Sequence, residues 1–179
     1  MNCLQEKNIR LQYYDYSSAG YYYVTICAKD RRYIFGRVVG TSVPARPRNG
    51  QDASLYVEFS KIGQYVDSAI KYYNANGSVL FDKYVIMPNH VHMIIVLKER
   101  ADERGRSSLQ NIIRNLKSYV TKQIGYSPWQ VRFYDHVIGD EADYLEIWQY
   151  IDNNPAKWAE DEYYTEWRLQ IESEMADQA

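Results

Sequence analysis

The sequence predicts an α+β fold, namely a ferredoxin-like antiparallel sheet with helices packed on one face. Strand-type and helix-type segments follow one another in the order strand, helix, strand, strand, helix, strand. The helix-type segments carry apolar residues at helical spacing on one side, as helices that rest on a sheet do. Pro88 interrupts a long apolar run, which therefore contains two strands rather than one.

The first part of this pattern contains two strands around a basic connection. Residues 21–28 are predicted to form a strand because they are rich in aromatic and β-branched side chains. Residues 37–53 combine Gly and Pro turn signals with three arginines, which indicates either a basic loop or a long hairpin arm. Residues 56–59 form the next, short strand.

Two amphipathic helices are predicted further along the chain. Ser60 is the expected N-cap of the first helix, which ends before Asn76-Gly77. For the second helix, Ser107 and Gln110 have the form of a capping box, and Gly125 is well placed as the stop. The apolar residues at helical spacing are Ile62, Val66, Ala69, Ile70 and Tyr73 in the first helix, and Leu109, Ile112, Ile113, Leu116, Val120 and Ile124 in the second.

The remaining elements complete a single domain. Strands are predicted at 79–86 and 90–97, joined by a turn at Pro88-Asn89, and at 131–138. From Asp140 onward the chain is expected to be helical, with a break at Pro155. We therefore expect a core of residues 1–139 and, in the same domain, an acidic, mostly helical C-terminal extension of residues 140–179.

Composition and charge narrow the class of protein. No uninterrupted apolar segment approaches the ~20 residues of a membrane span, and residues 1–10 lack the apolar stretch of a secretion signal. Two cysteines are too few for a disulfide framework, so a cytoplasmic location is expected. Residues 1–139 contain 19 Lys and Arg against 11 Asp and Glu, whereas residues 140–179 contain 2 against 12. This asymmetry indicates a basic surface that attracts polyanions and an acidic tail.

The histidine pair His90-Val91-His92 is the main candidate for a functional site. Side chains alternate across a strand, so the two imidazoles should share one face and one divalent cation. Two histidines are an incomplete ligand set, and a third ligand must come from elsewhere. The alternative is that both are ordinary polar residues on a half-buried strand.

The helix 108–124 offers a third ligand and a nucleophile. Tyr119 and Gln123 are at i and i+4, so they lie on one side of the helix, at the edge of its apolar stripe. Gln123 can supply a carbonyl oxygen to a hard cation, and Tyr119 can place its phenolic oxygen beside it. The span 104–123 contains five basic residues and no acid, which favours a phosphate nearby. The alternative for Tyr119 is an ordinary amphipathic tyrosine at the helix edge.

The motif Met87-Pro88-Asn89-His90-Val91-His92 resembles the His-hydrophobic-His motif of HUH-type single-strand transposases. The surroundings are more particularly similar to the REP-associated tyrosine transposases, over roughly residues 20–160. The chain departs from many relatives in having Gly139 after its last predicted strand, where they have Arg, and in its acidic tail. The further matching segments are Arg31-Arg32-Tyr33-Ile34-Phe35-Gly36, Leu116-Lys117-Ser118-Tyr119, Trp129-Gln130, Phe133-Tyr134-Asp135-His136-Val137-Ile138 and Tyr150-Ile151-Asp152-Asn153-Asn154-Pro155.

The resemblance implies an HUH endonuclease-type fold and a specific chemistry. It implies that His90, His92 and Gln123 bind a divalent metal, Mg²⁺ or Mn²⁺, and that Tyr119 is the catalytic nucleophile. The reaction would be cleavage and rejoining of single-stranded DNA near hairpins through a 5′-phosphotyrosine. We also weigh two alternatives: a catalytically inactive hairpin DNA-binding protein, and a rolling-circle-type replication or mobilisation initiator.

The expected partner is single-stranded DNA with hairpins, and no membrane is expected as a partner. We expect the protein to be a monomer or a homodimer and to associate with the nucleoid when it acts. A basic surface would hold its phosphates through charge. The predicted DNA-binding residues are Arg31, Arg32, Arg46, Arg48, Arg114, Lys117, Lys122 and His136.

Overall fold

The computed structural model describes residues 15, 18–40, 55–77, 79–98, 108–161 and 164. The six strands are β1 (Gly20–Cys27), β2 (Gly36–Gly40), β3 (Leu55–Phe59), β4 (Leu80–Ile86), β5 (His90–Leu97) and β6 (Tyr134–Ile138). The three α-helices are α1 (Lys61–Asn76), α2 (Leu109–Ile124) and α3 (Glu141–Asn153), and the short 3₁₀ turns are η1 (Lys29–Arg31) and η2 (Trp158–Glu160).

Four strands form one antiparallel sheet in the order β4-β5-β1-β6. With α1 before β4 and α2 before β6, this order confirms the predicted ferredoxin-like plan. The strand β5 is interior, so its residue His92 pairs with Thr25 of β1 on one side and Val85 of β4 on the other. The strands β2 and β3 pair in a separate two-stranded ribbon, consistent with the hairpin-arm interpretation of the segment after β1.

The sequence signals for the helix ends are mostly confirmed. The Ser60 side chain accepts a hydrogen bond from the Gly63 amide at the start of α1, and Gly77 ends the helix with a positive φ of 67°. Gly125 likewise ends α2. The N-cap of α2 is Ser108 rather than the predicted Ser107, because it is Ser108 that accepts from the Asn111 amide, at 3.3 Å.

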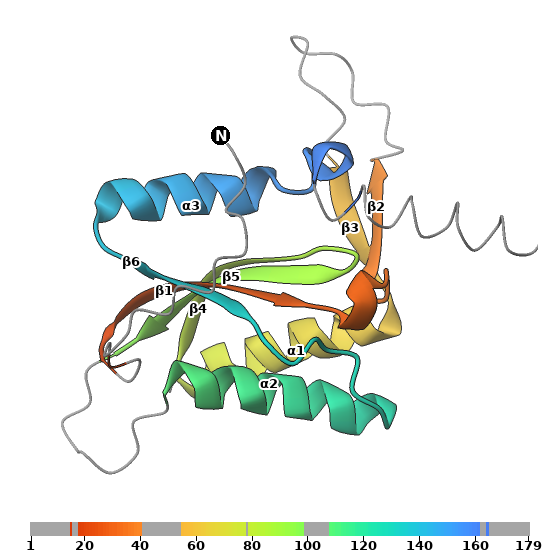
Figure 1. Ribbon diagram of the computed structural model, residues 1–179, viewed down its shortest axis with the longest axis horizontal. Coiled ribbons are helices and arrows are strands. Elements are labelled where there is room, and N and C mark those ends of the chain that lie inside the picture. The colour runs from red at the N-terminus through yellow and green to blue at the C-terminus, as the bar shows by residue number, and fades with distance from the viewer. Residues whose placement is uncertain are drawn as a thin grey trace, which may run out of the picture.

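The helices α1 and α2 cover one face of the sheet and α3 covers the other (Figure 1). Between the sheet and α1 and α2 lies a continuous aliphatic core. On α2 five side chains of the predicted stripe are fully buried, and each such burial stabilises the fold by roughly 1.5–3 kcal/mol. These residues are Leu109, Ile112, Ile113, Leu116 and Val120.

The C-terminal part of the predicted fold differs in detail. Strand β6 begins at Tyr134 rather than at residue 131, and α3 ends at Asn153, shortly before Pro155. A 3₁₀ turn, η2, follows the break. Within the described residues no helix combines the length and apolar character that crossing a membrane requires.

Candidate functional site

His90 and His92 lie side by side on the α3 face of the central strand β5. Their ring centroids are 4.4 Å apart, and both side chains are buried. Ile94, two residues further along the same face, packs against Ile151 of α3, which fixes the side of the sheet to which the imidazoles belong. The predicted same-face orientation is therefore confirmed.

Both imidazoles are held neutral by their surroundings. Burial lowers the pKa of His92 to about 3. Burial also lowers the pKa of His90 well below its usual value, with further lowering by His92 and Arg31 and a partial opposing effect from the neighbouring Asn154 side chain. A neutral imidazole has a ring nitrogen lone pair to give to a cation, which is the form that metal binding needs.

Each imidazole is oriented through its Nδ1 atom. Nδ1 of His90 lies 2.8 Å from Oδ1 of Asn89. Nδ1 of His92 lies 2.8 Å from both the Tyr23 and the Thr25 hydroxyl oxygens. With Nδ1 engaged in both rings, Nε2 is the nitrogen left to face the space under α3, and such second partners are a common feature of histidine ligands.

The structure does not bring Tyr119 and Gln123 to this pair. Both residues are exposed on α2, whose buried stripe packs in the core on the opposite face of the sheet from the two imidazoles. The prediction that Gln123 converges with His90 and His92 on one cation is wrong, and so is the prediction that Tyr119 lies beside it. The edge of the α2 apolar stripe, where Tyr119 and Gln123 lie, faces solvent on the α1 and α2 side of the sheet. It does not reach the face that carries the histidines.

Two other residues, at the C-terminal end of α3, lie beside the histidines where Tyr119 and Gln123 were expected. The Tyr150 hydroxyl lies 3.5 Å from Nε2 of His92, with the ring centroids 5.2 Å apart. Asn154, one turn further on, is almost completely buried and acts on His90 by partly raising its pKa. Among the described residues no hydrogen-bond partner reaches its Oδ1 atom. Tyr150 and Asn154 are at i and i+4, the same spacing as Tyr119 and Gln123.

The donors fit a hard divalent cation. The described residues contain no cluster of three or more His, Cys, Asp or Glu side chains. Two neutral imidazoles and the buried Oδ1 of Asn154 nevertheless form a mixed nitrogen and oxygen set that suits Mn²⁺, and Mg²⁺ less well. Three protein donors leave positions for water or a phosphate oxygen.

Polar contacts at both ends fix α3 over this site. At its start, Asp140 caps the helix and His136 of β6 pairs with Asp143 at 2.8 Å. Near its end, the Lys83 ammonium of β4 lies 2.5 Å from Asp152 and 3.8 Å from the centroid of the Trp148 ring. These contacts set the rotation of α3 that turns Tyr150 toward His92.

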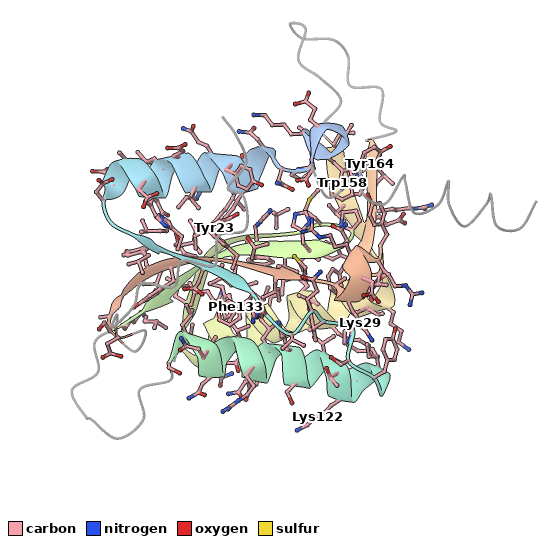
Figure 2. The ribbon with its side chains drawn as sticks, viewed as in Figure 1. Tyr23, Lys29, Lys122, Phe133, Trp158 and Tyr164 are labelled. Atoms are coloured by element: carbon pink, nitrogen blue, oxygen red, sulfur yellow. The ribbon has the colours of Figure 1, made fainter. Side chains whose placement is uncertain are left out.

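Aromatic rings enclose the other side of His90. Trp158 of η2 lies 6.0 Å from the His90 ring and 5.2 Å from the Tyr33 ring, measured between centroids. Tyr164 packs against Trp158 from outside at 5.6 Å. Figure 2 shows Tyr23 and Trp158 on the α3 side of the sheet, with Lys122 on the opposite side.

The predicted DNA-binding residues are divided between two regions. Arg114 and Lys122 are exposed on α2, away from the histidines, while Arg31 and Arg32 belong to the turn after β1. Lys117 is partly buried, and its ammonium donates to the Gln130 carbonyl at 2.7 Å, while burial lowers its pKa to about 8. The remaining members are His136, which pairs with Asp143, and Arg46 and Arg48, which lie outside the described residues.

No protein-family model matches this chain. A curated relative, an uncharacterized protein of Haemophilus influenzae, is 30% identical over 186 residues, which cover 89% of this chain and 93% of the relative. The chain belongs to the same family as this protein.

In fold, this chain is similar to the solved structure of a REP-associated tyrosine transposase bound to a REP hairpin. The TM-score is 0.54 at 24% sequence identity, and the match covers 82% of this chain and 73% of the other. The likeness supports the ferredoxin-like plan of the main sheet and its helices.

Proposed function

We propose that this chain is a metal-dependent single-stranded DNA transposase or endonuclease that acts near hairpins through a tyrosine intermediate. The observation that carries the proposal is the Tyr150 hydroxyl 3.5 Å from Nε2 of His92, in one cluster with His90 and Asn154. A phenol beside neutral donors for a cation suits nucleophilic attack on a phosphodiester. The hairpin complex of the structurally similar transposase supports the choice of substrate.

In the proposed reaction Oη of Tyr150 attacks the scissile phosphorus and the bond from phosphorus to O3′ breaks. The Tyr150 proton passes to solvent, to which the side chain is 37% exposed, and O3′ takes up a proton to leave as a free 3′-OH. The DNA stays attached as a 5′-phosphotyrosine. A second 3′-OH then attacks the same phosphorus and loses its proton to solvent, while the bond from phosphorus to Oη of Tyr150 breaks and Tyr150 takes up a proton. The strands are joined, and no ATP is needed because the phosphotyrosine link keeps the energy of the phosphodiester.

The cation would be held by Nε2 of His90, Nε2 of His92 and Oδ1 of Asn154. A divalent ion bound there supplies Lewis-acid polarisation of the scissile phosphate and stabilises the charge that develops on its oxygens. The protein contributes the neutral state of the imidazoles, the direction of their Nε2 atoms and the position of the Tyr150 hydroxyl.

The chain provides a matched pair of tyrosines for the test. Tyr150→Phe and Tyr119→Phe each remove one hydroxyl from a partly exposed helix surface, so both variants are expected to fold. Both are incubated with hairpin-bearing single strands and Mg²⁺ or Mn²⁺, and denaturant-resistant adducts are counted and mapped by mass spectrometry. We expect the Tyr150→Phe variant to form no adduct and the Tyr119→Phe variant to form as much as the parent.

Two results would contradict the assignment of Tyr150. One is an adduct that survives Tyr150→Phe, and the other is DNA mapped to Tyr119. Binding of hairpin DNA by the parent with no adduct on any strand of the panel would instead favour the inactive hairpin-binding protein. Strand cutting without rejoining would favour the replication or mobilisation initiator.

The proposed DNA path crosses from one face of the protein to the other. Residues 108–134 contain four Lys and Arg and no Asp or Glu, whereas residues 140–161 contain one Lys and seven Asp and Glu. The acidic α3 surface repels a phosphate backbone, while α2 attracts it. We therefore place the backbone along Arg114 and Lys122 and past the turn that carries Arg31 and Arg32, so that only the cleaved segment enters under α3.

A further inference from the structure

The side chain of Asn89 joins two parts of the site that are distant in sequence. Asn89 lies in the turn between β4 and β5 and is fully buried. Its Nδ2 donates to the Arg31 carbonyl at 3.1 Å, and its Oδ1 lies 2.8 Å from Nδ1 of His90. One carboxamide thus contacts both a candidate metal ligand and the η1 turn.

These two contacts determine which nitrogen of His90 carries the proton. The Arg31 carbonyl can only accept, so the atom that faces it must be the amide NH₂ of Asn89. The oxygen of Asn89 then faces His90 and can only accept, so Nδ1 of His90 must carry the hydrogen. The lone pair consequently lies on Nε2. His92 has no such constraint, since the hydroxyls of Tyr23 and Thr25 can each donate or accept.

The same side chain holds an unusual piece of backbone. Asp30 and Arg31 have φ values of 55° and 51°, in the left-handed region that is unfavourable for residues other than glycine. The η1 turn is attached to the strand connection by the Ala28 amide, which donates to the Asn89 carbonyl at 2.8 Å, and the Asn89 side chain adds the bond to Arg31.

We propose that Asn89 is a positioning residue that keeps His90 in the Nδ1–H tautomer and clamps the left-handed Arg31 turn against that histidine. The use of His90 by a cation rests on the proposed function, but the tautomer and the clamp do not. In this arrangement the Asn89 carboxamide orients Nε2 of His90 and fixes the backbone of Arg31.

The test uses ¹⁵N-labelled protein without DNA or metal. The chain has only three histidines, so their ring nitrogens can be assigned individually. In the parent, Nδ1 of His90 should give the protonated signal. Asn89→Ala removes the acceptor and should move His90 toward the Nε2–H tautomer, whereas Asn89→Asp keeps an oxygen there and should preserve Nδ1–H. His136, on β6, should not change.

Two further measurements separate the roles. Asn89→Ala should weaken Mn²⁺ binding by about 10–100-fold, as loss of such second partners does. Asn89→Asp loses the donor to the Arg31 carbonyl, so amide hydrogen exchange at Arg31, Arg32 and Ile34 should become faster. Asn74→Ala is the matched control, because the Asn74 carboxamide also brackets a backbone, that of Phe81, at 2.8 and 3.1 Å. It should alter neither the His90 signals nor Mn²⁺ binding.

An Nδ1–H tautomer of His90 that persists in folded Asn89→Ala would overturn the first half of the proposal. Unchanged exchange at Arg31, Arg32 and Ile34 in the nearly isosteric Asn89→Asp would overturn the second half, and this result is informative even if Asn89→Ala does not fold. Neither readout uses DNA or strand cleavage. The conclusions on the His90 tautomer and the Arg31 turn therefore hold even if no strand cleavage is found.

Discussion

The two faces of the sheet are built from different side chains and serve different purposes. On the α1 and α2 face, a continuous set of buried aliphatic and aromatic residues fills the space between the layers. On the α3 face the buried apolar cluster of the described residues is small, namely Tyr23, Ile94 and Ile151. Partly buried apolar side chains such as Ile147 and Trp148 pack against it, and histidines, tyrosines and ion pairs complete the contact. The first face supplies most of the apolar burial, and the second leaves polar atoms directed at a common point.

The largest expected effect concerns stability on the first face. Leu116→Ala removes a fully buried side chain from the α2 stripe and should lower the free energy of unfolding by about 2–5 kcal/mol. Ile151→Ala on α3 should cost toward the lower end of this range, because its partly buried neighbours can close around the space. Urea unfolding followed by circular dichroism measures both. A larger loss for Ile151→Ala would show that the α3 face contains the main core.

The second effect concerns Asn154, the third proposed metal donor. It distinguishes the pair of Tyr150 and Asn154 from the pair of Tyr119 and Gln123, which has the same i, i+4 spacing. Asn154→Ala should weaken Mn²⁺ binding by about 10-fold or more, roughly 1.4 kcal/mol, because one of three protein donors is lost. Gln123→Ala, on the opposite face, should leave the affinity unchanged. Isothermal titration of the protein without DNA measures both constants. Equal affinities in the two variants would remove Asn154 from the ligand set.

The smallest effect concerns the charge difference between the faces. Replacing Arg114 and Lys122 together by Gln should reduce the dependence of DNA affinity on salt, by a slope of up to about 0.7 for each single-strand phosphate that the protein no longer neutralises. Replacing Glu141 and Glu146 of α3 by Gln, as the matched pair, should strengthen binding slightly or leave it unchanged. Fluorescence anisotropy at several salt concentrations gives the slopes. An unchanged slope in the α2 variant would place the DNA backbone elsewhere.

The sequence was most informative where a local rule decides the outcome. Strand alternation placed His90 and His92 on one face, and Ser60, Gly77 and Gly125 marked helix ends through hydrogen bonding and backbone conformation. The order of strands and helices was sufficient for the ferredoxin-like plan, since few sheet orders satisfy short antiparallel connections.

The third ligand and the nucleophile depended on a non-local fact. The chain has two Tyr and amide pairs at i, i+4, Tyr119 with Gln123 and Tyr150 with Asn154, and spacing alone cannot rank them. The choice follows from which face of the sheet each helix covers. The strong apolar stripe of α2 packs in the main core, so α3 is the helix that covers the face with the histidines. The sequence signal that could have identified Tyr150 and Asn154 was the motif from Tyr150 to Pro155, which follows the last strand.

The interior position of β5 has a consequence for the entropy of ligand binding. His92 is paired with β1 on one side and β4 on the other, His90 is paired with β1, and both side chains are buried. Their conformational freedom, of order 1–2 kcal/mol per backbone residue, is lost when the chain folds and not when a cation arrives. Asn154 is buried as well, and the contacts of Lys83 with Asp152 and Trp148 fix the end of α3 that carries Tyr150. Binding of a cation would therefore cost these side chains little further conformational entropy.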